Sequence, residues 1–327
     1  MLNNHLLIPI SNYFDLNKSH LASIRLRAYP CAEALRKSDY SFTIGERVNI
    51  NANAIIVGKI GTSADIDSRS NKWLAQLAEA KSRGVSIYLD YTDHHLGFNT
   101  PMTFFYQSAL SLTDCCIVPS EFMAKLLRAH YHGPIIVIED SIEITSQSVK
   151  TKLVSSQSTA LWFGHASNVK FLIDFINSSE FLISGCNLIV LSNENGLNIF
   201  SQSSLKFINR NQIRLGLWSV ESMLNAARIA DFSIIPSDLF NTRKLGISSN
   251  RLITSFALGL PTAADHLPSY QEFSDSYVDI RGPLFSKMVD MPLNFSNLTT
   301  SAQSLYVDRF NPESIGQKWL SLLLNRQ

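Results

Sequence analysis

The sequence predicts an α/β protein built from two doubly wound, Rossmann-like domains. Short apolar runs alternate with helical patterns along the chain, which is typical of parallel βαβ architecture. The alternation stops at a stretch rich in Ser, Thr, Gln and Lys between Thr145 and Thr159, and then starts again. A chain of 327 residues is long enough for two domains, each with its own core.

The first half predicts strands connected by helices. Its first helical stretch is Leu21–Leu35, with a break expected at Pro30 because proline lacks the amide proton that a helix interior needs. Trp73–Ala80 and Glu121–Ala129 are the next helices, and Ser120 can cap the second of these. The predicted strands are short apolar runs: Leu6–Ile10, Ala54–Val57, Val85–Leu89, Cys115–Val118 and Ile135–Ile138.

The second half repeats the pattern. Helices are predicted at Val169–Ile176, Val220–Ala230 and Asn250–Leu258, and a last apolar helix at Pro312–Leu324. The strands are again short apolar runs: Ala160–Phe163, Asn187–Leu191, Ile213–Leu215, Phe232–Ile235 and Pro261–Ala263.

We place the domain boundary in the polar stretch, which gives domains at residues 1–148 and 149–327. The last helix is expected to cross back to the first domain. Ligands of parallel α/β folds bind at the carboxyl ends of the strands, so a central cleft faced by both domains is the predicted active site.

Composition excludes several classes of protein. A net charge of +1 gives no general affinity for polyanions, so no nucleic-acid partner is expected. The sequence shows no apolar window of membrane-spanning length, and the opening MLNNHLLIPIS lacks a basic region before a long apolar one, so neither a membrane span nor a secretory leader is expected. We expect a cytoplasmic protein with at most peripheral contact at the inner membrane face. The cysteines show no metal-ligand spacing and are predicted to be reduced core residues: Cys31, Cys115, Cys116 and Cys186.

The segment Arg243–Pro261 predicts an anion site. Arg243 and Lys244 precede small polar residues at the start of a helix, where backbone amides and the positive end of the helix dipole favour a diphosphate. The alternative is an ordinary helix whose first turn is capped by Ser248 or Ser249.

A second polar cluster, Asp90–His95, directly follows a predicted strand. Asp93 can accept the proton of an acceptor hydroxyl, or orient or activate His94. The alternative is that Asp93 caps the following turn and that the histidines are partly exposed loop residues. Arg25 and Arg27 on the first predicted helix and Lys59 after the strand Ala54–Val57 can form a basic acceptor pocket. The alternative is that they are solvated helix and loop charges.

Several segments, in this order, resemble the GT-B glycosyltransferases. Ile117-Val118-Pro119-Ser120 and the strand Ile135–Ile138 with its exit resemble the end of their first domain. Leu161-Trp162-Phe163-Gly164-His165 resembles the first strand and glycine loop of their second domain. Ala230-Asp231-Phe232-Ser233-Ile234-Ile235-Pro236-Ser237 resembles a later strand, and the Arg243–Pro261 segment follows it. The resemblance implies a GT-B fold and transfer of a sugar from a nucleotide donor, held mainly by the second domain, to an acceptor held mainly by the first.

The resemblance also implies site residues. Gly164 allows a phosphate to approach the backbone, Arg243 and Lys244 would neutralise a leaving diphosphate without a metal, and Trp218 would contact the base, or else serve as a core or hinge aromatic. The other residues of the predicted donor site are His165, Ser248, Ser249, Asn250 and Thr254.

The chain departs from the family in one motif. The Glu-x7-Glu pair of many retaining members falls here on Gly246 and Thr254, and a threonine cannot make the bidentate contact of a carboxylate with a ribose. We therefore do not carry over a particular sugar, nucleotide or stereochemical outcome.

The sequence thus predicts a metal-independent glycosyltransferase of surface polysaccharide biosynthesis, with no cofactor besides its nucleotide-sugar substrate and with a glycan or lipid-linked glycan acceptor. Two alternatives remain. Asp93-His94-His95 also resembles the metal-binding triplet of DHH phosphoesterases, for which Asp65-Ile66-Asp67 is a displaced second ligand pair. The missing Glu pair also fits a catalytically inactive GT-B-like binding subunit.

Overall fold

A computed structural model describes residues 3–19, 21–61, 65–153, 156–178, 186–206 and 208–324. The chain divides into two compact units. Unit 1 comprises Met1–Ser141, Thr242–Ser248 and Phe310–Gln327, and unit 2 comprises Ile142–Asn241 and Ser249–Arg309. Unit 1 is therefore built from three segments of the chain, whereas the sequence suggested a boundary near residue 148 and a last helix that returns to the first domain.

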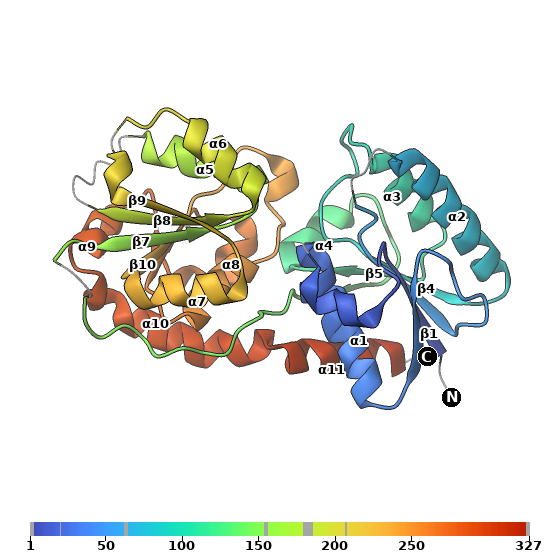
Figure 1. Ribbon diagram of the computed structural model, residues 1–327. Coiled ribbons are helices and arrows are strands. Elements are labelled where there is room, and N and C mark those ends of the chain that lie inside the picture. Colours follow the sequence, from blue (N-terminus) through green and yellow to red (C-terminus); the bar gives the residue numbers. More distant parts are fainter. Residues whose placement is uncertain are drawn as a thin grey trace. The chain divides into compact units, whose positions relative to one another are not determined.

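Unit 1 is a parallel sheet between two layers of helices (Figure 1). Its strand order is β2-β1-β3-β4-β5-β6, so the chain reverses direction across the sheet between β1 and β3. The strands are β1 (Asn3–Leu7), β2 (Ser41–Gly45), β3 (Ala54–Val57), β4 (Ser86–Asp90), β5 (Cys115–Val118) and β6 (Ile135–Val137). The α-helices are α1 (Tyr29–Lys37), α2 (Ile66–Ser82), α3 (Thr103–Leu110), α4 (Glu121–Leu127) and α11 (Pro312–Leu324).

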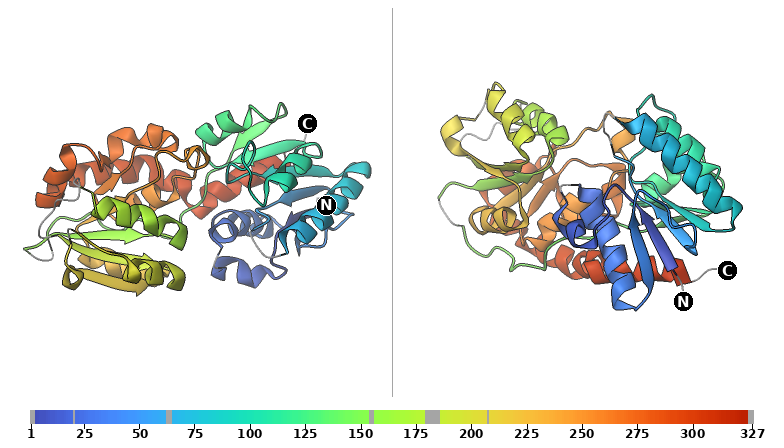
Figure 2. Two further views of the ribbon diagram at one scale, coloured as in Figure 1. Left: turned by 90° about the horizontal axis from the view of Figure 1, so that it is seen from above. Right: turned by 45° about the vertical axis from the view of Figure 1, so that its right-hand side comes forward.

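Alternate residues of each strand build the two cores of unit 1. Ile55 and Val57 of β3 pack with Trp73 of α2, while Ile56 between them packs on the opposite face with Trp319 of α11. Helix α11 packs across α1 (Figure 2), and a Cβ on its Gly316 would come within 2.9 Å of the Ala34 Cβ. The glycine therefore permits the close approach of these two helices.

Unit 2 is a second parallel sheet, in the order β12-β11-β10-β7-β8-β9, which is the strand order of the dinucleotide-binding folds. Helices α5 and α6 cover one face of it and α7 and α8 the other (Figure 1). The strands are β7 (Thr159–Phe163), β8 (Asn187–Ser192), β9 (Ile213–Leu217), β10 (Phe232–Ile235), β11 (Thr262–Ala264) and β12 (Val278–Asp279). The α-helices are α5 (Ala166–Ile176), α6 (Glu194–Gln202), α7 (Val220–Ile229), α8 (Asn250–Ala257), α9 (Leu284–Asp290) and α10 (Ser296–Ala302).

The polar stretch that was expected to be a linker is packed on unit 2. The backbone amides of Gln147 and Lys150 donate to the carbonyl groups of Ala257 and Gly259 at 2.7 and 3.1 Å. Gly259 has φ +74°, and a Cβ there would lie 2.3 Å from the Ser148 carbonyl oxygen. Residues 145–150 are therefore part of the unit, whatever their composition suggests.

The expected break at Pro30 is also wrong. The chain is helical from Ala22 through Lys37, as a π-helical turn (Ile24–Ala28) that continues into α1, and Pro30 occupies the first turn of α1. Pro30 cannot donate to the carbonyl group of Leu26 four residues earlier, but that oxygen accepts from the Ser141 amide at 3.0 Å, so no carbonyl group is left without a partner there. The four cysteines are buried and free, as predicted.

Candidate functional site

Polar side chains gather at the carboxyl edge of the unit 1 sheet. Lys59 follows β3, Asp93 follows β4, and Ser120 follows β5. The segment Thr242–Ser248, which leaves unit 2 after β10, also belongs to unit 1 and brings Arg243 and Lys244 to the same edge. This edge is where parallel α/β folds bind ligands.

Asp93 and Lys59 form an ion pair there. Their side chains are 25% and 32% exposed, so both remain accessible. Burial alone would raise the pKa of Asp93, but the Lys59 ammonium and, secondarily, Lys244 outweigh it and hold the pKa below its usual range. The Asp93 side chain is therefore ionised at neutral pH and lies next to positively charged side chains.

The two histidines that follow are buried and neutral. Burial lowers the pKa of His94 and of His95 to about 4 each, and the Arg243 guanidinium contributes in both cases. His94 lies 3.1 Å through Nδ1 from the Tyr91 hydroxyl, and His95 lies 3.0 Å through Nδ1 from Thr100 Oγ1. The alternative that these histidines are partly exposed loop residues is wrong, since His94 is 6% exposed and His95 1%.

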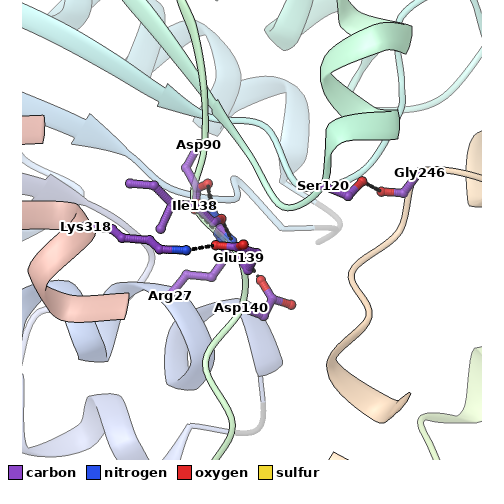
Figure 3. Close-up of polar contacts among 8 residues, drawn as sticks. All are labelled: Arg27, Asp90, Ser120, Ile138, Glu139, Asp140, Gly246 and Lys318. Atoms are coloured by element: carbon purple, nitrogen blue, oxygen red, sulfur yellow. Dashed lines mark hydrogen bonds and ion pairs between the residues drawn. The ribbon is translucent and has the colours of Figure 1, made fainter. Parts of the chain in front are cut away.

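Arg243 holds the segment Thr242–Ser248 on this turn. Its Nε donates to the His94 carbonyl oxygen at 3.2 Å, its terminal nitrogen lies 3.4 Å from Nδ1 of His95, and the guanidinium carbon is 5.9 Å from the centre of the Phe98 ring. Ser120 Oγ donates to the Gly246 carbonyl oxygen at 2.9 Å (Figure 3). The sequence analysis assigned this segment to the second domain, whereas its contacts here are with unit 1.

Arg27 is engaged in a buried network. Its Nε and one terminal nitrogen donate to Asp90 at 2.6–2.9 Å, and the other terminal nitrogen donates to the Ile138 carbonyl oxygen and to Asp140 at 2.7 and 2.8 Å (Figure 3). The side chain is 1% exposed. Arg27 is thus neither a solvated charge nor available to an acceptor. Its predicted part in an acceptor pocket is therefore replaced by a structural role.

Arg25 and Lys59, the other two residues predicted for the acceptor pocket, are more exposed than Arg27. Arg25 is half-buried and donates to the Ser19 carbonyl oxygen at 2.5 Å. Lys59 lines a small pocket, together with Arg27 of the first helical stretch and Asp90 at the end of β4. Sequence reasoning missed the Asp90 and Asp140 partners of Arg27, because they are 63 and 113 residues away along the chain.

In unit 2 the backbone amides of the glycine loop, which follows β7, already form hydrogen bonds within the unit. His165 is the N-cap of α5 and its Nδ1 accepts from the Ser167 amide at 3.3 Å, while the Ala166 amide donates to Asn193 Oδ1 at 3.1 Å. The amide of Gly164 donates to the Leu191 carbonyl oxygen at 3.0 Å. These amides already have partners, so a phosphate would have to replace existing bonds.

The other predicted donor residues follow β9 or lie at the start of α8. Trp218 is half-exposed directly after β9, and its amide donates to the Ser192 carbonyl oxygen at 2.9 Å. Ser249 is the N-cap of α8 but makes no side-chain capping bond, and Thr254 is buried within the helix. Ser248 and Asn250 on either side of Ser249 are half-buried.

Asp265 is a residue of the unit 2 edge that the sequence analysis missed. It follows β11, is fully buried, and accepts from the Ser237 amide at 2.7 Å and from Arg281 Nε at 2.5 Å. It thereby ties together the ends of β10, β11 and β12. A carboxylate directly after the apolar run ending at Ala264 was the available signal.

Within the part of the chain that the structure describes, no three His, Cys, Asp or Glu residues are grouped so that they could hold a metal ion. Asp65 of the displaced phosphoesterase ligand pair instead lies 3.7 Å from Arg69. None of the helices in the described ranges is long and apolar enough to cross a membrane.

Several solved structures share this architecture. An α-glucosyltransferase in complex with UDP and a 13-mer DNA containing an HMU base superimposes with a TM-score of 0.65 and 9% identity, over 98% of this chain and 99% of that one. The lipopolysaccharide outer core galactosyltransferase WaaB matches with a TM-score of 0.56 and 10% identity over the full length of both chains. This chain has a GT-B fold.

The other comparisons show the fold but no family for this chain. TarM matches with a TM-score of 0.56 and 11% identity over 90% of this chain, which spans only 58% of the TarM chain. No protein-family model and no curated protein matches the sequence. At such identities the likeness establishes the GT-B fold, and the reaction has to be argued from the site.

Proposed function

We propose that this GT-B protein transfers a sugar from a nucleotide donor to a hydroxyl acceptor. The observation that carries the proposal is the cluster at the carboxyl edge of unit 1, where one carboxylate, Asp93, lies among the cations Lys59 and Lys244, with Arg243 on the adjacent turn. Excess positive charge beside a proton-accepting carboxylate suits a reaction in which an anionic leaving group departs and a hydroxyl is deprotonated.

The donor would be held by its diphosphate. Arg243 and Lys244 supply the positive charge that would otherwise require a metal ion, so we propose a metal-independent reaction. The other residues proposed for the donor are Ser248 of unit 1 and, within unit 2, Ser249 and Asn250 at the start of α8, Thr254 inside that helix, and Trp218, Gly164 and His165 at the edge of the sheet. UDP and UDP-glucose in the similar α-glucosyltransferase structures support a nucleotide-sugar donor.

The acceptor would bind at unit 1. In this proposal Asp93 accepts the hydroxyl proton. Lys59, which follows β3, and Arg25, which precedes α1, would contact the acceptor. We propose a glycan or lipid-linked glycan of surface polysaccharide biosynthesis, in the cytoplasm or at the inner membrane face. A DNA acceptor is the competing class, since the α-glucosyltransferase that matches over nearly its whole length is bound to DNA.

Nucleotide binding tests the proposal first. A ligand that binds only the native state raises the melting temperature, so the purified chain is screened against UDP, GDP, CDP, CMP, dTDP and ADP, with and without magnesium. We expect a magnesium-independent shift with one nucleotide. Shifts that require magnesium would favour a phosphoesterase, and no shift with any nucleotide would favour an inactive binding subunit.

The acceptor is tested with the nucleotide sugar that the screen selects. Transfer to lipid-linked or free oligosaccharides is compared with transfer to DNA that contains hydroxymethylated bases. Transfer only to DNA would replace the glycan assignment while leaving the glycosyltransferase assignment intact.

A further inference from the structure

Tyr91 organises the turn that carries the two buried histidines. It directly follows β4, and its side chain is fully buried. The hydroxyl oxygen accepts from the backbone amide of His95 at 2.7 Å and from that of Leu96 at 3.1 Å. The same oxygen lies 3.1 Å from Nδ1 of His94.

These contacts determine where the hydroxyl proton goes. A phenol oxygen has one proton and two lone pairs, and the two backbone amides occupy the lone pairs. The proton has one partner left, which is Nδ1 of His94. Burial raises the pKa of Tyr91 to about 12, so the proton is present at neutral pH.

The tautomer of His94 follows. Nδ1 accepts a hydrogen bond from the Tyr91 hydroxyl and therefore carries no proton of its own, so the single proton of the neutral imidazole is on Nε2. The groups facing the ring do not favour a second proton: His130 is 5.8 Å away between ring centres, Phe98 lies edge-on at 5.4 Å, and Arg243 donates to the carbonyl group of the same residue.

Nε2 of His94 is the nitrogen left for a ligand. Among the described residues nothing forms a hydrogen bond with Nε2, and this atom is not among the fully buried polar atoms that lack a partner, so part of its surface is exposed. It belongs to the same turn as Asp93.

We propose that Tyr91 is a positioning residue that fixes His94 as the Nε2–H tautomer, so that His94 meets the substrate as a hydrogen-bond donor to an oxygen atom and does not act as a proton acceptor. The assignment of the tautomer depends only on the hydrogen bonds of Tyr91, whereas the contact with a substrate rests on the proposed function. Deprotonation of the acceptor is then left to Asp93.

The tautomer is measured directly by long-range ¹H–¹⁵N NMR of the histidine rings at neutral pH. We expect an unprotonated Nδ1 and a protonated Nε2 for His94 in the unmodified protein. In Tyr91→Phe the Nδ1–H form should become populated, whereas Tyr131→Phe, which removes a hydroxyl bonded to the Thr113 carbonyl oxygen, should leave the His94 signals unchanged. A protonated Nδ1 in the unmodified protein would overturn the proposal, and this spectrum needs no variant to fold.

The donor role is tested by paired substitutions at His94. A glutamine retains an N–H donor but is no base, so His94→Gln should keep a transfer rate at least several-fold above that of His94→Ala. An equal loss of transfer rate in the two variants would contradict the role of His94 as a hydrogen-bond donor. If the unmodified protein shows no transfer with any nucleotide sugar, the proposed function fails, while the NMR result decides the role of Tyr91 by itself.

Discussion

Asp93 is the residue on which the proposed chemistry depends most. Because Lys59 and Lys244 keep it ionised, it can accept a hydrogen bond from an acceptor hydroxyl in the ground state. We expect Asp93→Asn to slow transfer by at least about 100-fold, the lower range for general acid–base catalysis, with donor affinity unchanged. Steady-state kinetics and calorimetric titration with the nucleotide measure the two effects.

The matched control for Asp93→Asn is Glu79→Gln, which removes a carboxylate of an exposed pair with Arg83 elsewhere in unit 1. It should transfer at the unmodified rate. Full turnover in Asp93→Asn would move the proton acceptor to another group.

Arg243 and Lys244 are the residues on which donor binding depends. Replacing either by alanine should weaken nucleotide binding by about 1.5–3 kcal/mol, the range for a hydrogen bond to a charged group. Isothermal titration calorimetry measures this loss, and Lys125→Ala on the exposed face of α4 serves as the control for removal of a positive charge. Undiminished affinity in both variants would contradict the diphosphate assignment.

At the scale of elements, the segment Thr242–Ser248 depends on a close fit to α4. A Cβ on Gly246 would lie 3.1 Å from Cα and 3.2 Å from the backbone nitrogen of Met123, which a backbone cannot easily relieve. Gly246→Ala should therefore displace the segment and lower nucleotide affinity several-fold. Calorimetry tests this, and an unchanged affinity would show that the position of the segment does not matter for binding.

The sequence predicted some elements to the residue because their signals are local. Ala54–Val57 and Cys115–Val118 are continuous apolar runs buried in the middle of the sheet, and both strands have these limits. The edge strand β2 (Ser41–Gly45) was missed because its side chains alternate between exposed and half-buried positions and its composition is polar. The helix α3 (Thr103–Leu110) was missed as well, because it is short and has no capping residue to mark its start.

The site shows the same division between local and distant information. Asp93 was singled out because a carboxylate follows a strand, and that signal lies within a few residues. The pairing of Arg27 with Asp90 and the docking of Arg243 on His94 join residues 63 and 149 positions apart, and no periodicity or spacing encodes them. The burial of Arg27 therefore became visible only in the folded unit.

At the scale of the whole molecule, buried neutral histidines tie stability to pH. Burial lowers the pKa of His5, His94 and His95 to about 4 each, whereas an unfolded histidine titrates near 6.5. Between these values the unfolded chain binds protons that the folded chain does not, so the free energy of unfolding must fall as the pH falls from about 6.5 towards 4. Each histidine can contribute up to about 3 kcal/mol to that loss.

His5 allows this dependence to be isolated away from the candidate site. It is buried in β1, with Nδ1 2.8 Å from Thr43 Oγ1 and Nε2 3.2 Å from the Gly45 carbonyl oxygen. In urea titrations between pH 7.5 and 5, above the range in which most carboxylates titrate, His5→Gln should be less stable at pH 7.5 but should lose stability less steeply as the pH falls. The exposed His132→Gln should follow the unmodified curve. A His5→Gln curve parallel to that of the unmodified protein would mean that His5 does not titrate differently in the folded and unfolded states.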